Sequence, residues 1–172
     1  VHGKGPLIDR MPGDEWQRFA NLRLLFGYMF THPGTKLLFM GGEFGQTFEW
    51  SIERGLEWDL MQFDYHKGVA QLIKKLNELY QQQPALFEKQ FSPDGFEWID
   101  HGDSDNSVLS YLRRGNEGDK PLVVVCNFTP VSREHFKQGV PIAGQWKEIL
   151  NTDAPEFGGS GHHQNPGKIE SV

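Results

Sequence analysis

The sequence predicts an α+β chain: a helix–strand–helix unit followed by an antiparallel β domain, a sandwich or a barrel. Two stretches, after Asp14 and over 69–83, carry apolar residues at spacings of three and four, which is typical of core-facing helices. Between them lies an uninterrupted apolar run, Leu37–Met40, which suits a parallel strand buried on both faces. Beyond residue 95, short apolar runs alternate with Gly-, Asn- and Asp-rich turns, as in antiparallel hairpins.

The first helix has clear start and stop signals. Asp14 can accept the free amides of a first helical turn, with Gln17 three residues on as the reciprocal partner. Pro33 biases the residue before it away from helical geometry, and Gly34 permits a positive φ, so the helix should end at His32. The expected core stripe is Phe19, Leu22, Phe26, Met29 and Phe30.

The segment after Leu37–Met40 is the most informative for function. It reads Gly41–Gln46, then Glu49-Trp50 and Glu57–Asp59. In parallel α/β folds, the loops that leave the carboxyl ends of strands build the active site. Carboxylates and an amide can bond sugar hydroxyls, and indole rings can stack on pyranose faces. The alternative is a tight turn with solvated carboxylates and two Trp that cover a domain edge.

The second helix and the β strands follow from pattern alone. The helix should bury Val69, Leu72, Ile73, Leu76, Leu79 and Tyr80 and end at Pro84. The expected strands are Phe96–Ile99, Val108–Leu112, Leu122–Phe128 and Trp146–Leu150. Residues 158–167 read as a long polar loop.

Composition excludes several classes of protein. The net charge is -6 and neither half of the chain is basic, which excludes a duplex nucleic-acid binder. No apolar run approaches the roughly 20 residues of a membrane span. Cys126 is the one cysteine, so an intrachain disulfide framework is impossible, in keeping with a cytoplasmic protein. The pair His162-His163 could suggest a metal site, but no third ligand has a helpful spacing, and we predict no metal.

A set of motifs runs in order over nearly the whole chain. Its segments are Val1–Gly5, Met11–Asp14, Phe19–Arg23, Leu37–Gln46, Leu56–Asp59, Pro84–Leu86, Gly95–Asp100, Ser107–Leu109 and Val125–Pro130. These motifs resemble those of the glycogen (1,4-α-glucan) branching enzymes of the α-amylase superfamily.

The resemblance implies a domain organisation. Residues 1–86 would be the last section of a (β/α)8 barrel, with Leu37–Met40 as its eighth strand and the helix over 69–83 as its eighth helix. Residues 87–172 would be the antiparallel all-β sandwich domain that follows, cut short at its end. The nucleophilic aspartate, the glutamate acid/base and a His-Asp pair would all precede Val1, so this chain would hold no catalytic residue and need no cofactor.

The resemblance also implies a function. The parent enzyme would cleave α-1,4-glucan and transfer the segment to a 6-hydroxyl, while this chain supplies the cleft rim and the β domain and is inactive alone. Its partners would be α-glucan (glycogen or amylose) and the N-terminal part of the same enzyme. Candidate substrate contacts are Lys4, Glu43, Gln46, Trp50 and Trp58. The alternatives are a non-catalytic glucan-binding module that uses Trp98 and Trp146, a structural interaction module, or part of another enzyme of the superfamily.

Overall fold

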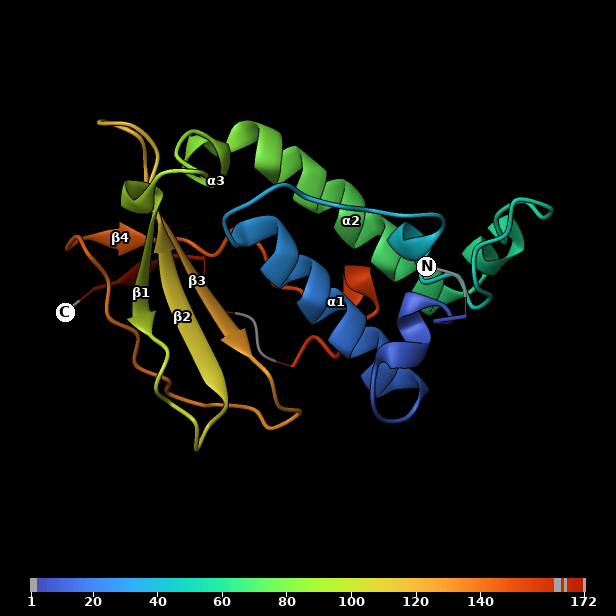
Figure 1. Ribbon diagram of the computed structural model, residues 1–172. Coiled ribbons are helices and arrows are strands. Elements are labelled where there is room, and N and C mark those ends of the chain that lie inside the picture. Colours follow the sequence, from blue (N-terminus) through green and yellow to red (C-terminus); the bar gives the residue numbers. More distant parts are fainter. Residues whose placement is uncertain (1–2, 163–164, 166, 172) are drawn as a thin grey trace. The chain divides into compact units, whose positions relative to one another are not determined.

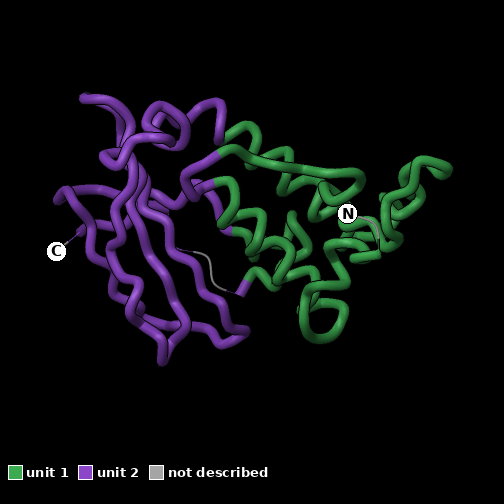
Figure 2. The backbone as a smooth tube through the Cα atoms, viewed as in Figure 1, with its two compact units in different colours: residues 1–30, 35–79, 152–161 green, residues 31–34, 80–151, 162–172 purple. Residues whose placement is uncertain are grey.

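The computed structural model describes residues 3–162, 165 and 167–171 and divides the chain into two compact units (Figures 1 and 2). Unit 1 holds residues up to 30, 35–79 and 152–161. Unit 2 holds 31–34, 80–151 and the described residues from 162 onward. The domains 1–86 and 87–172 therefore stay a prediction: the units divide between residues 79 and 80, and 152–161 groups with unit 1.

Helix α1 spans Glu15–Thr31 and begins with the predicted capping box. The Gln17 amide donates to Asp14 Oδ1 and the Asp14 amide donates to Gln17 Oε1, both at 2.9 Å. The helix ends before Pro33, and Gly34 takes a φ of 111°. Four of the five predicted stripe residues are buried, and Met29 is half-buried.

Helix α2 spans Asp64–Gln82 and starts five residues before the predicted stripe. Its apolar face is buried as expected from Val69 to Leu79, and Tyr80 is half-buried. The ring of Phe19 in α1 packs against Tyr65 and His66 of α2, with centroids 5.2 and 4.8 Å apart. Helix α3, Pro84–Phe87, follows in unit 2. None of the helices in the described part of the chain combines the length and apolar character that a membrane crossing requires.

The segment Leu37–Met40 is not a strand, and the prediction of a buried parallel strand is wrong for this structure. Residues 35–39 have no regular secondary structure, and Met40 lies in a turn. Leu37 is 73% exposed and Phe39 is 52% exposed. A parallel strand needs neighbours that take up its N–H and C=O groups. No strand among the described residues pairs with this segment, so its apolar side chains stay at the surface.

Residues 152–161 lie against the helices of unit 1 and contain a short 3-10 helix, η5 (Pro155–Phe157). The buried Arg23 of α1 donates to the Thr152 carbonyl at 2.9 Å and pairs with Asp153 Oδ1 at 3.3 Å. Phe157 is buried, and its carbonyl faces Gly68 of α2 so closely that a Cβ on the glycine would lie 2.3 Å from the oxygen. The first part of the predicted polar loop is bonded to this segment, since the Ser160 amide donates to Asp153 Oδ1 at 3.0 Å and the Gly161 amide to the Asp153 carbonyl at 2.9 Å. Residues 163, 164 and 166 of that loop lie outside the described residues.

Unit 2 contains two antiparallel sheets, as the turn pattern predicts. One has three strands in the order β1-β2-β3, and in it Trp98 pairs with Tyr111 and Ser110 with Val125. In the other, β4 pairs with β5. β4 is shorter than the predicted Trp146–Leu150. The strands are β1 (Phe96–Asp100), β2 (Val108–Arg113), β3 (Leu122–Asn127), β4 (Gln145–Trp146) and β5 (Ile169–Glu170).

A buried arginine anchors the three-stranded sheet to the segments around it. Arg113, at the end of β2, is 0% exposed. Its Nε donates to the Gly95 carbonyl and its Nη2 to the Leu86 carbonyl, both at 3.1 Å, and its Nη1 donates to the Thr31 carbonyl. Burial lowers the pKa of Arg113, because the surroundings solvate the cation less well than water does. One guanidinium thus links the last residue of α1, α3 and the start of β1.

The lone cysteine is a buried residue of β3. Cys126 is 5% exposed, and burial raises the pKa of its thiol to about 11, although a hydrogen bond with Tyr111 acts in the opposite direction. A protonated, buried thiol is a poor nucleophile. Cys126 therefore serves as a small core residue.

Candidate functional site

The loop from Gly41 to Trp58 in unit 1 starts with a tight, glycine-dependent turn. Gly41 has a φ of 83° and Gly45 a φ of 71°, left-handed values that side chains rarely adopt. Gly42–Phe44 form a 3-10 turn, η2, between them. A Cβ on Gly41 would lie 2.5 Å from the side-chain oxygen of Gln46. The turn thus places Gly41 against the side chain of Gln46, the first residue after the turn.

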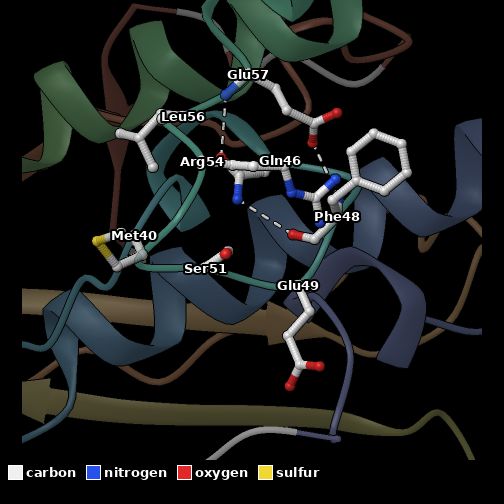
Figure 3. A pocket seen from close by; sticks show the side chains of 9 residues that line it. Met40, Gln46, Phe48, Glu49, Ser51, Arg54, Leu56 and Glu57 are labelled. Carbon is white, nitrogen blue, oxygen red and sulfur yellow. Dashed lines mark hydrogen bonds between the residues drawn. The ribbon is translucent and has the colours of Figure 1, made fainter.

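Two side chains hold the rest of the loop closed (Figure 3). The buried Gln46 donates from Nε2 to the Phe48 carbonyl at 3.1 Å, and its Oε1 accepts the Glu57 amide at 3.2 Å. In return, Glu57 Oε2 accepts the amides of Thr47 and Phe48 at 2.8 and 2.9 Å. The Thr47 hydroxyl also donates to this carboxylate, at 3.1 Å to Oε2. Residues 46–48 and residue 57 are therefore joined by bonds in both directions, which we call the Gln46–Glu57 clamp.

A histidine on α2 fixes the base of the loop. The buried His66 has its Nδ1 2.8 Å from the Phe44 carbonyl, so the ring donates a hydrogen bond to this oxygen. Phe44 lies 22 residues before His66, so no local spacing in the sequence reveals this pair. The imidazole of His66 has a structural role, since its Nδ1 is hydrogen-bonded to the main chain of the turn.

Aromatic side chains gather along this loop. The Trp50 ring is half-buried and packs edge-on against Phe39, with centroids 5.5 Å apart. Trp58 is 62% exposed and lies 5.1 Å from the Phe44 ring. Phe48 is also exposed, and the Arg54 guanidinium lies 5.3 Å from its centroid, in a cation–π contact. The loop therefore presents flat apolar rings beside polar groups.

The hollow inside the loop is small. It encloses about 40 Å³ and is lined by Met40, Gln46, Phe48, Glu49, Ser51, Arg54, Gly55, Leu56 and Glu57 (Figure 3). That volume has room for a few water molecules, since about 10–15 Å³ of such space holds one. A sugar ring does not fit in it, so any contact of this loop with a sugar must be made by the exposed rings and edges.

The five candidate contacts occupy different environments. Gln46 lines the hollow, but its amide is bonded to the main chain at both ends and it is only 6% exposed. Lys4 is exposed, and its main-chain amide donates to Glu49 Oε1 of the loop at 3.0 Å. Glu43 is half-buried on the η2 turn. Trp50 and Trp58 lie farther along the same loop.

The sequence pattern did not single out Thr47 and Arg54, and it did not indicate the role of Glu57 in closing the loop. Glu57 stood in the informative stretch, but nothing in it marked the carboxylate as a partner of Thr47 ten residues earlier. The described residues contain no group of three His, Cys, Asp or Glu side chains placed to hold a metal ion. His163 of the His162-His163 pair is outside the part of the chain described.

Comparison with known proteins gives consistent results. Residues 98–172 match the family model described as the alpha amylase, C-terminal all-beta domain. The chain is 56% identical over 168 residues to the 1,4-alpha-glucan branching enzyme GlgB of Aquifex aeolicus, covering 98% of this chain and 27% of that enzyme. It is 56% identical to the enzyme of the same name from Rhodopirellula baltica, with 99% and 25% covered. For the one from Oceanobacillus iheyensis the identity is 53%, with 94% and 25% covered. The chain spans about a quarter of the length of these relatives.

Proposed function

Because the chain corresponds over nearly its whole length to the C-terminal part of the 1,4-alpha-glucan branching enzymes, we propose that it works as part of such an enzyme. The parent enzyme cleaves an α-1,4-glucan and transfers the released segment to a 6-hydroxyl, which makes an α-1,6 branch. The observation that carries this proposal is the 56% identity over 98% of the chain. The lone, buried Cys126 suits the cytoplasm, where we place the enzyme.

The chemistry requires two carboxyl groups. In a retaining transfer, one carboxylate attacks the sugar and forms a covalent glycosyl-enzyme, and the other protonates the leaving oxygen and later deprotonates the acceptor hydroxyl. The two lie roughly 5 Å apart. We assign both, together with the His-Asp pair, to the part of the parent enzyme outside this chain. Glu43 and Glu49 are not given these roles, because the resemblance places them on the rim after the last barrel strand. Glu57 is not given one either, because its carboxylate accepts the amides of Thr47 and Phe48 in the loop itself. The isolated chain should therefore be inactive.

The contribution of this chain is the rim of the glucan cleft. The loop after Met40 carries two indole rings, exposed polar groups and an internal clamp, a combination that suits a sugar chain lying across a firm surface. Trp50, Trp58, Lys4 and Glu43 are the proposed contacts. Gln46 keeps its place at the rim as a scaffold, because its amide already bonds the main chain of Phe48 and Glu57.

Exposed apolar side chains support the proposal that the rest of the enzyme packs on unit 1. Leu37, Phe39 and Met40 are exposed on a segment that has no regular structure in this chain. We propose that this segment pairs in the parent enzyme as the last strand of the barrel. Pairing would bury these side chains and give the main-chain groups strand partners.

The Trp50→Ala substitution in the full-length enzyme tests the rim proposal. Loss of a stacking ring should raise KM for long amylose about fivefold, or about 1 kcal/mol, with kcat little changed. Trp50→Phe, which keeps a ring, should give an intermediate value. The control is Phe91→Ala, which removes a ring that is 77% exposed in unit 2 and should leave KM unchanged. Wild-type kinetics for Trp50→Ala would remove this residue from the proposed contacts.

A second candidate function is glucan binding without catalysis. Trp98 of β1 is 39% exposed and packs against Phe96 and Tyr111, with ring centroids 4.9 and 5.7 Å away, so unit 2 presents a supported indole ring. Retardation of the isolated chain in an amylose gel, abolished by Trp98→Ala, would favour this candidate over the cleft-rim role.

A further inference from the structure

The ends of the 46–57 segment are held together by the Gln46–Glu57 clamp, whereas its middle is exposed. Ile52 is 88% exposed, and Glu53, Arg54 and Gly55 are exposed as well. Within the middle, the Glu53 amide bonds the Ser51 hydroxyl at 3.1 Å. Fixing the main chain of one residue costs about 1–2 kcal/mol of entropy. An exposed loop therefore needs strong bonds at its ends to keep one conformation.

The carboxylate of Glu57 supplies the strongest of these bonds. Hydrogen bonds to an ionised acceptor are roughly twice as strong as those between neutral groups. Oε2 of Glu57 accepts from two successive main-chain amides, those of Thr47 and Phe48, and from the Thr47 hydroxyl. Gln46, by comparison, makes one bond in each direction between neutral groups.

The clamp holds the residues that carry the rings. Phe48 is itself a donor to Glu57, Trp50 lies two residues beyond it, and Trp58 directly follows Glu57. Without the bonds from Glu57 to Thr47 and Phe48, the two ends of the loop are no longer held at a fixed distance. All three rings are then free to change position. The Glu57 carboxylate is hydrogen-bonded to the amides of Thr47 and Phe48, so it does not contact a ligand itself. It acts on ligand binding by fixing the positions of the aromatic rings.

We propose that Glu57 is a positioning residue for glucan binding: its carboxylate, bonded to the amides of Thr47 and Phe48, fixes the loop so that Trp50 meets the sugar chain in one orientation. This inference rests on the proposed function, and it names a residue that acts on the substrate through another side chain. Glu57 sets the affinity for long glucan and takes no part in bond cleavage.

The test uses three substitutions in the full-length enzyme. Glu57→Ala removes the acceptor and should raise KM for long amylose about fivefold, with kcat within about twofold of wild type, as for loss of binding shared by ground state and transition state. Glu57→Gln keeps an oxygen that can accept both amides and should recover most of the loss. Glu53→Ala removes an exposed carboxylate of the same loop that is not part of the clamp, and it should behave as wild type.

A second readout separates this inference from the proposed function. In enzyme labelled with 5-fluorotryptophan, the fluorine resonance of Trp50 should shift or broaden in Glu57→Ala and stay in place in Glu53→Ala. A shifted resonance with unchanged KM would overturn the positioning role, and so would an unshifted resonance or a Glu57→Gln enzyme no better than Glu57→Ala. If Trp50→Ala has wild-type kinetics, the result contradicts the proposed contact between Trp50 and the glucan. In that case the fluorine resonance of Trp50 in Glu57→Ala still shows whether the clamp fixes this ring.

Discussion

Replacing Arg113 with methionine should lower the free energy of unfolding by about 2–4 kcal/mol. The guanidinium is 0% exposed and donates to the carbonyls of Thr31, Leu86 and Gly95. Methionine fills a similar volume but donates nothing, so the Thr31 and Leu86 carbonyls lose this donor, whereas the Gly95 carbonyl keeps the Arg114 amide at 3.1 Å. Each buried acceptor left unsatisfied costs about 1–3 kcal/mol, and relief of the burial penalty of the cation offsets part of the sum.

The neighbouring Arg114 gives a matched control. Its side chain is 40% exposed and pairs with Glu97 at the surface, and exposed ion pairs of this kind are worth about 0–1 kcal/mol. Arg114→Met should therefore change stability by less than about 1 kcal/mol. Denaturant unfolding followed by circular dichroism measures both variants. Equal, small losses would show that Arg113 does not anchor the sheet.

The Gly68→Ala substitution should destabilise the protein by about 2 kcal/mol, although alanine is the better helix former by about 1 kcal/mol. A Cβ on Gly68 of α2 would lie 2.3 Å from the Phe157 carbonyl oxygen and 2.8 Å from the Gly158 nitrogen. These are main-chain atoms of the 152–161 segment and cannot rotate away. The segment or the helix must shift, and the contacts around the buried Phe157 loosen.

A second helical glycine offers the comparison. A Cβ on Gly27 of α1 would lie 3.0 Å from the Thr152 methyl group, which belongs to a side chain that can turn. Gly27→Ala should therefore stay within about 1 kcal/mol of wild type, in either direction. Melting temperatures of the two variants test the difference. A Gly68→Ala protein as stable as wild type would mean that 152–161 does not pack on α2 as described.

The features predicted correctly from the sequence depend on local signals. The Asp14–Gln17 capping box needs residues three apart, and the stripes of α1 and α2 follow from helical periodicity. The hairpin strands β1, β2 and β3 are each bounded by turn residues close by in the chain. All of these can be read within a window of a few residues.

The features that were missed depend on distant partners. Leu37–Met40 has the composition of a buried strand, but a strand exists only where neighbours pair with it. Arg113 is a charged residue, and the usual expectation would place it at the surface. Its three acceptors lie 18, 27 and 82 residues away, so no spacing reveals them.

The position of the candidate site stays a prediction, and the structure adds the hydrogen bonds within it. The loop after Met40 was identified from its glycines, carboxylates and Trp residues. The different roles of the residues within this loop were not identified from the sequence. The hydrogen bonds of Gln46 and Glu57 join residues 2 to 11 apart, and these separations follow no helical or strand period. The structure shows that Gln46 and Glu57 are used to close the loop.

The most direct test of the proposal that this chain is one part of a branching enzyme is a search for new α-1,6 linkages. Amylose is incubated with the full-length enzyme or with the 172-residue chain alone, and the anomeric protons are followed by nuclear magnetic resonance. The α-1,6 signal should grow with the full-length enzyme and stay at background with the isolated chain. Growth of that signal with the isolated chain, or its absence with the full-length enzyme, would contradict the proposal.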